Sequence, residues 1–221
     1  MVGVRMPRPG TAVQAGCLVP LAVWGWRMVT GALGANPIEA SIRMSGEWTL
    51  WFLLACLAVT PVRRLFGLPH LAPLRRTFGL FSFFYGVLHV VGYAAVDQTL
   101  DIGAIVADAT RRVHIGVGVA AFLLMVPLAV TSTRRAVARI GAQRWRLFHR
   151  AVYAVAVLAV VHVSLLVKGR SPEPWLYGVA VSVLLLARGP AVRFPAIRPV
   201  VQRLVSIMGR HPDDVSRRIA R

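Results

Sequence analysis

The sequence has little charge and few cysteines. Only 15% of its 221 residues are charged, whereas 57% are hydrophobic, a composition far from that of soluble or disordered chains. Both cysteines, Cys17 and Cys56, lie in apolar runs, so neither a disulfide framework nor a CxxCH motif can be written. A GxGxxG fingerprint is also missing. These absences argue against a secreted disulfide-rich fold and against a soluble nucleotide-binding domain.

Long apolar runs dominate instead, and each membrane-spanning helix needs about 20 such residues. We therefore predict an all-α membrane protein, a six-helix transmembrane bundle over residues 1–194, followed by a basic cytoplasmic tail over residues 195–221. The first run could also be a cleaved signal peptide, because a basic start precedes it and small residues follow it, but we favour an anchor. The six runs are Ala15–Trp26, Trp48–Val62, Phe78–Val96, Val113–Thr133, Ala151–Val167 and Trp175–Ala187.

Acidic residues are scarce, and the net charge of +18 is distributed on one side of this topology. Segments 1–12, 63–76, 134–150 and 188–221 carry twenty arginines and two acids, whereas the intervening loops carry six basic and six acidic residues. An excess of arginine marks the cytoplasmic side of a membrane protein. We therefore expect both termini inside, with the arginines facing anionic lipid headgroups, and nucleic-acid binding is not needed to explain the charge.

Two histidines lie inside predicted spans, where an ionisable side chain is costly and is a functional candidate. His89 in the third span and His162 in the fifth both lie roughly 10 Å below the outer surface, at 1.5 Å per residue. Zinc would need further ligands at that depth, whereas haem supplies four nitrogens itself and needs only two axial histidines. We favour a haem over the alternative that each ring only bonds a neighbouring backbone.

A third histidine, His149, opens the fifth helix at the cytoplasmic boundary and precedes His162 on that helix. On an ideal helix the two rings would point about 140° apart, so a second haem on this helix needs bending. Arg76 occupies the corresponding position ahead of His89, where it could pair with a haem propionate. His149 is thus either a contact of a second redox centre or a structural cap. No ligand role is expected for the other histidines, His70, His114 and His211.

Several short stretches occur in a characteristic order over about residues 18–190. They are Leu33–Pro37, Thr60–Pro61, Arg75–Leu80 leading to His89 and Tyr93, Pro127–Ser132, Arg144–Tyr153, and Val167–Lys168 after His162. As an ordered set they resemble the MsrQ family of haem-binding membrane subunits, within the ferric-reductase-like transmembrane group. By position, the family's three histidines correspond to His89, His149 and His162. The sequence departs from the family at His114, where an apolar residue is usual.

The resemblance implies an electron-transfer subunit, rather than a catalytic subunit, in the bacterial inner membrane. Such a carrier serves MsrP, a periplasmic molybdenum-containing reductase of methionine sulfoxide in oxidised proteins. Electrons would come from the quinone pool or from a cytoplasmic flavin reductase. The implied cofactors are b-type haem, one or two, and FMN, for which the residues themselves give no fingerprint.

Basic residues on the expected cytoplasmic side could dock a flavin phosphate, a haem propionate or an acidic partner. Anchoring to lipid headgroups is an equally good interpretation. Two further function classes stay open, namely a stand-alone membrane reductase of metal or quinone, and a non-redox transporter or assembly protein. The cytoplasmic-side residues that could dock such a group are the arginines Arg75, Arg76, Arg144, Arg146 and Arg150, together with Trp145.

Overall fold

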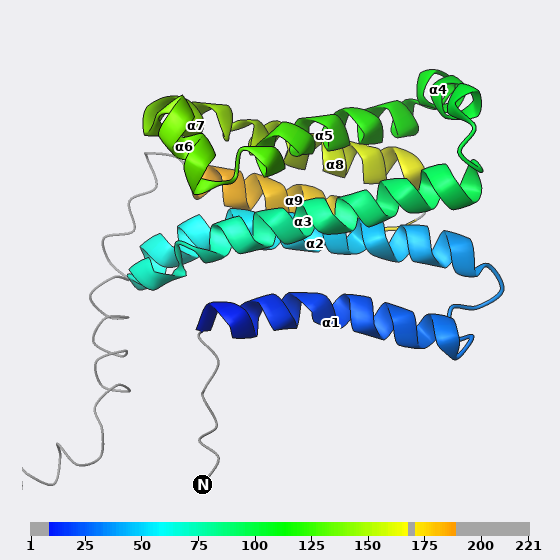
Figure 1. Cartoon of the computed structure of the whole chain (residues 1–221), viewed down its shortest axis with the longest axis horizontal. Helices are drawn as coiled ribbons and strands as arrows, with labels where there is room; N and C mark the ends of the chain where they lie inside the picture. The colour runs from blue at the N-terminus through cyan, green and yellow to red at the C-terminus, as the bar shows by residue number, and fades with distance from the viewer. Residues whose placement is uncertain (1–8, 168–170, 189–221) are drawn as a thin grey trace, which may run out of the picture.

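In the computed structural model, residues 9–167 and 171–188 are described, and the regular elements in these ranges are helical. The long helices lie side by side along the longest axis of the molecule (Figure 1). They are α1 (Pro9–Val29), α2 (Pro37–Phe66), α3 (Leu74–Val91), α5 (Val113–Val130), α8 (Ala151–Val167) and α9 (Glu173–Leu186). The short elements are a 3₁₀ turn η1 (Pro69–Leu71), a π-helix η2 (Gly92–Asp97), α4 (Ile102–Arg111), α6 (Arg134–Ile140) and α7 (Ala142–Phe148).

Five helical stretches are long and apolar enough to cross a membrane, so the chain is a multi-pass membrane protein. The sixth predicted run forms α9, which is apolar but has only 14 residues. Each predicted apolar run thus contains a helix of the structure. The predicted tail, residues 195–221, lies outside the described residues. The five stretches are Thr11–Val29, Pro37–Phe66, Pro69–Asp97, Val113–Val130 and Ala142–Val167.

The second helix is longer than the sequence predicts. It begins at Pro37, well before Trp48, because Asn36 caps its first turn by accepting a hydrogen bond from a backbone amide. Two charged residues in the added turns, Arg43 and Glu47, pair at 3.3 Å with the (i, i+4) spacing of a helix. Gly67 ends α2 in the left-handed conformation, with φ of 67°.

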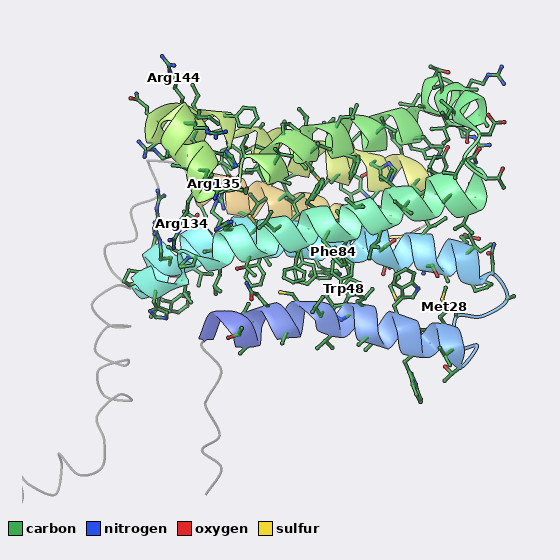
Figure 2. The ribbon with its side chains drawn as sticks, in the orientation of Figure 1. Met28, Trp48, Phe84, Arg134, Arg135 and Arg144 are labelled. Carbon is green, nitrogen blue, oxygen red and sulfur yellow. The ribbon has the colours of Figure 1, made fainter. Side chains whose placement is uncertain are left out.

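Two helix pairs form the body of the bundle, α2 against α3 and α5 against α8, and α9 packs on α8 and α2. Leu57, Val155 and Ala156 are fully or almost fully buried between these helices. The short helices lie at opposite ends: α6 and α7 form the α6–α7 end, and α4 marks the α4 end (Figure 1). Figure 2 shows Arg134, Arg135 and Arg144 at the α6–α7 end, far from Met28.

Helix α1 is held to the bundle by a buried tyrosine. The Tyr85 hydroxyl accepts a hydrogen bond from Leu21 N at 3.1 Å and donates one to the Cys17 carbonyl at 3.0 Å. These two backbone groups are four residues apart in α1, next to Pro20, and the hydroxyl bonds to both of them. A membrane interior offers no water to replace it, so these bonds tie α1 to α3.

An arginine at the α6–α7 end completes the proline-containing end of α2. Pro61 has no N–H, which leaves the Leu57 carbonyl without its helical donor. Arg188 donates to that carbonyl at 3.1 Å from Nε and 2.6 Å from Nη2, and to the Tyr153 hydroxyl at 3.3 Å. Burial lowers the pKa of Arg188, while the hydrogen bond to Tyr153 raises it.

Candidate functional site

Two histidines predicted from their depth meet near the α4 end of the bundle. His89 lies in the last turn of α3, and His162 lies in α8. Their ring centroids are 6.2 Å apart, with the ring planes at 83° to each other. The structure therefore brings together two imidazoles from helices that are far apart in sequence.

Each of these rings is oriented by a backbone carbonyl. The Nδ1–H of His89 donates to the Ile42 carbonyl at 2.7 Å, and that of His162 donates to the His114 carbonyl at 2.6 Å. A carbonyl can only accept, so in a neutral imidazole these bonds put the hydrogen on Nδ1 and the lone pair on Nε2. A histidine that binds a metal through one ring nitrogen is usually held in place by such a hydrogen bond from the other ring nitrogen.

Two glycines make room for the rings. A Cβ added to Gly46 would lie 3.0 Å from His89 Nδ1, and one added to Gly118 would lie 2.8 Å from His162 Nδ1. Side chains essentially never approach a Cβ atom as closely as the second distance. Glycine is therefore required at position 118, and any larger residue would displace the imidazole.

The pair fits a metal that takes two histidines on one axis. A metal bound by both Nε2 atoms at about 2 Å would put the ring centroids roughly 6 Å apart, close to the observed spacing. Among the described residues, no group of three or more His, Cys, Asp or Glu could hold a metal ion. That donor set suits haem iron, which needs only two axial ligands, better than zinc.

The structure also places His114 beside this pair, which sequence reasoning did not anticipate. Its ring centroid lies 6.4 Å from that of His162, with the planes at 41°. Its backbone carbonyl, rather than its side chain, orients His162. A backbone contact of this kind leaves no signal in the residue type.

A cavity of about 350 Å³ opens toward the α6–α7 end, between α2, α3, α5, α7 and α8. His149 and Trp145 form part of its wall, and three arginines face the same space. Cationic and aromatic walls suit a planar ligand that carries negative charge. The polar lining residues are Thr60, Arg63, Arg75, Arg76, Ser82, Ser132, Trp145 and His149.

His149 lies in the turn between α7 and α8, two residues before α8 begins, and not at the start of that helix as predicted. Its ring stacks on Trp145 with centroids 3.7 Å apart and planes at 27°. Its Nδ1–H donates to the Trp145 carbonyl at 3.1 Å, and its Nε2 lies 3.5 Å from Ser132 Oγ. Because His149 precedes α8, the angle expected between it and His162 on one continuous helix does not apply.

The residues predicted to dock a phosphate or a propionate divide into two groups. Arg75, Arg76 and Trp145 line the cavity with His149, whereas Arg144, Arg146 and Arg150 are exposed and do not line it. Figure 2 shows Arg144 pointing away from the bundle. Sequence reasoning missed Arg63 as a lining residue. A signal existed, because Arg63 follows the Thr60–Pro61 stretch at the end of the second apolar run.

Comparison with known proteins identifies the family. The family model described as "Ferric reductase like transmembrane component" matches residues 45–160. The chain is 52% identical to the "Protein-methionine-sulfoxide reductase heme-binding subunit MsrQ" of Rhodospirillum rubrum, over 82% of this chain and 88% of that protein. The identically named subunit of Caulobacter vibrioides is 43% identical, with coverage of 80% and 84%. For that of Rhizobium meliloti the identity is 44%, with coverage of 78% and 80%.

No solved structure matches this chain. The family model spans most of α2 to most of α8, and it covers His89 and His149, whereas His162 lies two residues beyond the match. The similarity to the first two relatives is longer, over 183 and 176 residues. The chain belongs to the MsrQ family, within the ferric-reductase-like transmembrane group.

Proposed function

We propose that this chain is a transmembrane electron carrier in which His89 and His162 hold a b-type haem near the outer surface. The observation that carries the proposal is the close pair of imidazoles, with ring centroids 6.2 Å apart and both Nδ1 atoms bonded to backbone carbonyls. The relatives are named as heme-binding subunits of a methionine-sulfoxide reductase, which supports the same conclusion.

The protein's own contribution is to position the ligands. The Ile42 and His114 carbonyls keep the Nε2 lone pairs available and raise the basicity of the rings. Stacked Phe83 and Phe122, whose centroids are 5.8 Å apart, supply an apolar wall between α3 and α5. A bound haem would supply a one-electron iron centre.

The direct test is spectroscopic. Replacing His89 or His162 with alanine should abolish or shift the low-spin spectrum of this haem, because each variant loses one axial ligand. His70→Ala is the matched control, since His70 is exposed in η1 and far along the chain from both rings. Wild-type spectra and haem content in both of the first two variants would refute the assignment.

The proposed direction of electron flow depends on topology. We propose six spans with both termini in the cytoplasm of a bacterium and the chain in the inner membrane, supported by the one-sided arginine distribution. In this orientation the α6–α7 end is cytoplasmic and the histidine pair lies on the periplasmic side. Reporter fusions after Asp101 and after Ala142 should report opposite sides, and identical sides would overturn the topology.

The inner cavity is proposed as the entry point for electrons. A carrier with one haem near the outer surface has no relay in its inner half, and His149 stacked on Trp145 lies in that half. Arg63, Arg75 and Arg76 could neutralise the propionates of a second haem or the phosphate of FMN. His149 would then contact the second redox centre.

A His149→Ala variant separates this role from a purely structural one. It should keep the outer haem but lose reduction by the cytoplasmic-side donor, whereas dithionite still reduces the haem. Donor-driven reduction equal to wild type would make His149 structural and would require electrons to enter elsewhere.

The proposed donor is the quinone pool or a cytoplasmic flavin reductase, and the proposed acceptor is the periplasmic molybdenum-containing subunit MsrP. Reconstituted vesicles containing this chain, a quinol and the acceptor should reduce methionine sulfoxide in a protein substrate. Turnover that is independent of the acceptor would favour a stand-alone reductase of metal or quinone. A colourless purified protein would favour a non-redox transporter or assembly protein.

A further inference from the structure

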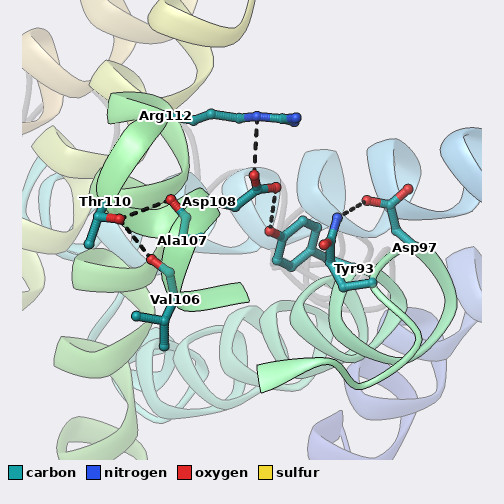
Figure 3. A network of polar contacts seen from close by, with 8 residues as sticks. Tyr93, Asp97, Val106, Ala107, Asp108, Thr110 and Arg112 are labelled. Carbon is teal, nitrogen blue, oxygen red and sulfur yellow. Dashed lines mark hydrogen bonds and ion pairs between the residues drawn. The ribbon is translucent and has the colours of Figure 1, made fainter. Parts of the chain in front are cut away.

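A polar network at the α4 end connects the segment that follows His89 with the segment that orients His162. Figure 3 shows Asp108 of α4 between Tyr93 of η2 and Arg112, the residue before α5. Tyr93 donates its hydroxyl hydrogen to Asp108 Oδ2 at 3.1 Å, and Arg112 Nε lies 3.3 Å from Asp108 Oδ1. The Asp108 side chain is 18% exposed, so this is a partly enclosed carboxylate with a partner on each oxygen.

The first branch of the network leads to His89. Tyr93 follows His89 by about one helical turn. Between them the helix changes from α to π at Gly92, whose N–H bonds to the carbonyls of His89 and Leu88. Single π turns are frequent at functional sites. Here the π turn carries Tyr93, whose side chain is hydrogen-bonded to Asp108.

The second branch leads to His162. The Arg112 carbonyl accepts hydrogen bonds from Ile115 N at 2.9 Å and Gly116 N at 3.2 Å, so it caps the first turn of α5. That turn contains His114, whose carbonyl accepts the 2.6 Å hydrogen bond from His162 Nδ1. The Arg112 backbone is in turn bonded to α4, because Arg112 N donates to the Asp108 carbonyl at 2.8 Å, so a shift of the Asp108 segment reaches the turn whose carbonyl orients His162.

The connection between α3 and α4 contains two residues in the left-handed conformation. Thr99 and Leu100 have φ values of 50° and 61°, a left-handed conformation that side-chain-bearing residues rarely adopt. Leu100 N bonds back to the Ala94 carbonyl at 2.8 Å. Strained backbone of this kind persists only where its surroundings hold it. Tyr93 links this connection to Asp108, because its carbonyl accepts a hydrogen bond from Gln98 N at 3.0 Å and its hydroxyl donates to Asp108.

Helix α4 is also pressed closely against α5. A Cβ added to Gly116 would lie 2.6 Å from the Ala109 carbonyl oxygen, so only glycine fits. This contact is one residue from Asp108 and two residues from His114. The carboxylate is thus fixed both to the end of α3 and to the start of α5.

We propose that Asp108 is a positioning residue that sets the relative orientation of His89 and His162, one ring through Tyr93 and the other through Arg112. The inference rests on the proposed haem ligation. Groups that hydrogen-bond a metal ligand orient it and tune the metal, and removing one typically costs about 10- to 100-fold in affinity. Asp108 acts one step further from the ligands, so about 10-fold, the lower end of this range, is the expected effect. We therefore expect Asp108 to influence the haem without touching it.

The test uses the full-length haem-loaded protein and three variants. Asp108→Ala removes both branches, Asp108→Asn keeps an acceptor for Tyr93 but removes the charge, and Tyr93→Phe removes only the branch to His89. Asp101→Asn is the matched control: it removes the same charge from the same segment, while asparagine still caps α4. Should Asp108→Ala fail to fold, the other two variants carry the test.

The readouts are the low-spin electron paramagnetic resonance spectrum, the haem midpoint potential and the retention of haem during dilution. We expect shifted spectra and potentials and about 10-fold weaker retention in Asp108→Ala, with smaller changes in the same direction in the other two variants. A Tyr93→Phe Asp108→Ala double variant should match Asp108→Ala, because the two side chains share one interaction.

Wild-type spectra, potential and retention in every Asp108 and Tyr93 variant would overturn this proposal and leave the haem assignment intact. Equal changes in Asp101→Asn would also overturn it, because they would indicate a general effect of charge. Absence of a low-spin haem from the wild-type protein would instead overturn the proposed function, and this inference with it.

Discussion

Adding one methyl group beside His162 is a sharp perturbation of the proposed haem site. In Gly118→Ala, the new Cβ would lie 2.8 Å from His162 Nδ1, whereas ordinary contacts begin at 3.4 Å. The imidazole must move, and its 2.6 Å hydrogen bond to the His114 carbonyl is strained or broken. Overpacking of this kind costs about 1–3 kcal/mol, which corresponds to a haem affinity roughly 5- to 150-fold lower.

The same change should not harm the helix that carries it. Alanine is more favourable than glycine inside a helix by about 1 kcal/mol, so α5 itself should be at least as stable as before. Gly178→Ala is the matched control, because a Cβ there meets Val160 at an ordinary 3.7 Å. The loss of haem in Gly118→Ala would therefore report the displaced ring and not a failure to fold.

The assay is haem titration of the apoprotein in detergent, followed by the absorbance of the low-spin species, with circular dichroism to check helix content. We expect weaker binding in Gly118→Ala and wild-type binding in Gly178→Ala. Wild-type haem affinity and spectrum in Gly118→Ala would refute the reasoning, since they would show that His162 does not need its observed position.

Three further changes test other parts of the structure. Tyr85→Phe should destabilise the docking of α1 by about 1–3 kcal/mol, since it removes two buried hydrogen bonds; faster proteolysis of α1 in detergent checks this, and wild-type resistance would contradict it. Arg188→Met leaves the carbonyl freed by Pro61 unpaired and should lower the unfolding temperature; an unchanged temperature would mean that water caps the carbonyl. Trp145→Leu removes the ring stacked on His149 and should slow donor-driven reduction while the outer haem spectrum stays normal; a normal rate would argue against an electron entry point in this cavity.

Hydropathy was sufficient to predict where the apolar helices lie in the chain, but not where they end. The start of α2 was missed because Arg43 and Glu47 interrupt the apolar pattern, and their mutual ion pair became visible only in the helix. The short helices α4, α6 and α7 were also missed, because amphipathic segments of 7–10 residues have no extended apolar run.

The histidine pair shows the same division within the site. Depth along two apolar runs was enough to predict that His89 and His162 could share a ligand. The Ile42 and His114 carbonyls could not be predicted, because every residue has a carbonyl and the sequence does not say which one faces a ring. Likewise, the sequence did not distinguish Arg144, which is exposed, from Arg63, which lines the cavity.

The sequence by itself determined the class of protein, because burial in a bilayer depends mainly on the composition of each run and the cost of charge within it. It also limited the chemistry to a few histidines, since ionisable residues are rare inside the apolar runs. Only the tertiary structure decided which backbone groups orient those histidines, which glycines admit them, and that Asp108 connects the segments on which they depend. These features depend on distances of a few ångströms between residues far apart in the chain, and helix packing sets those distances.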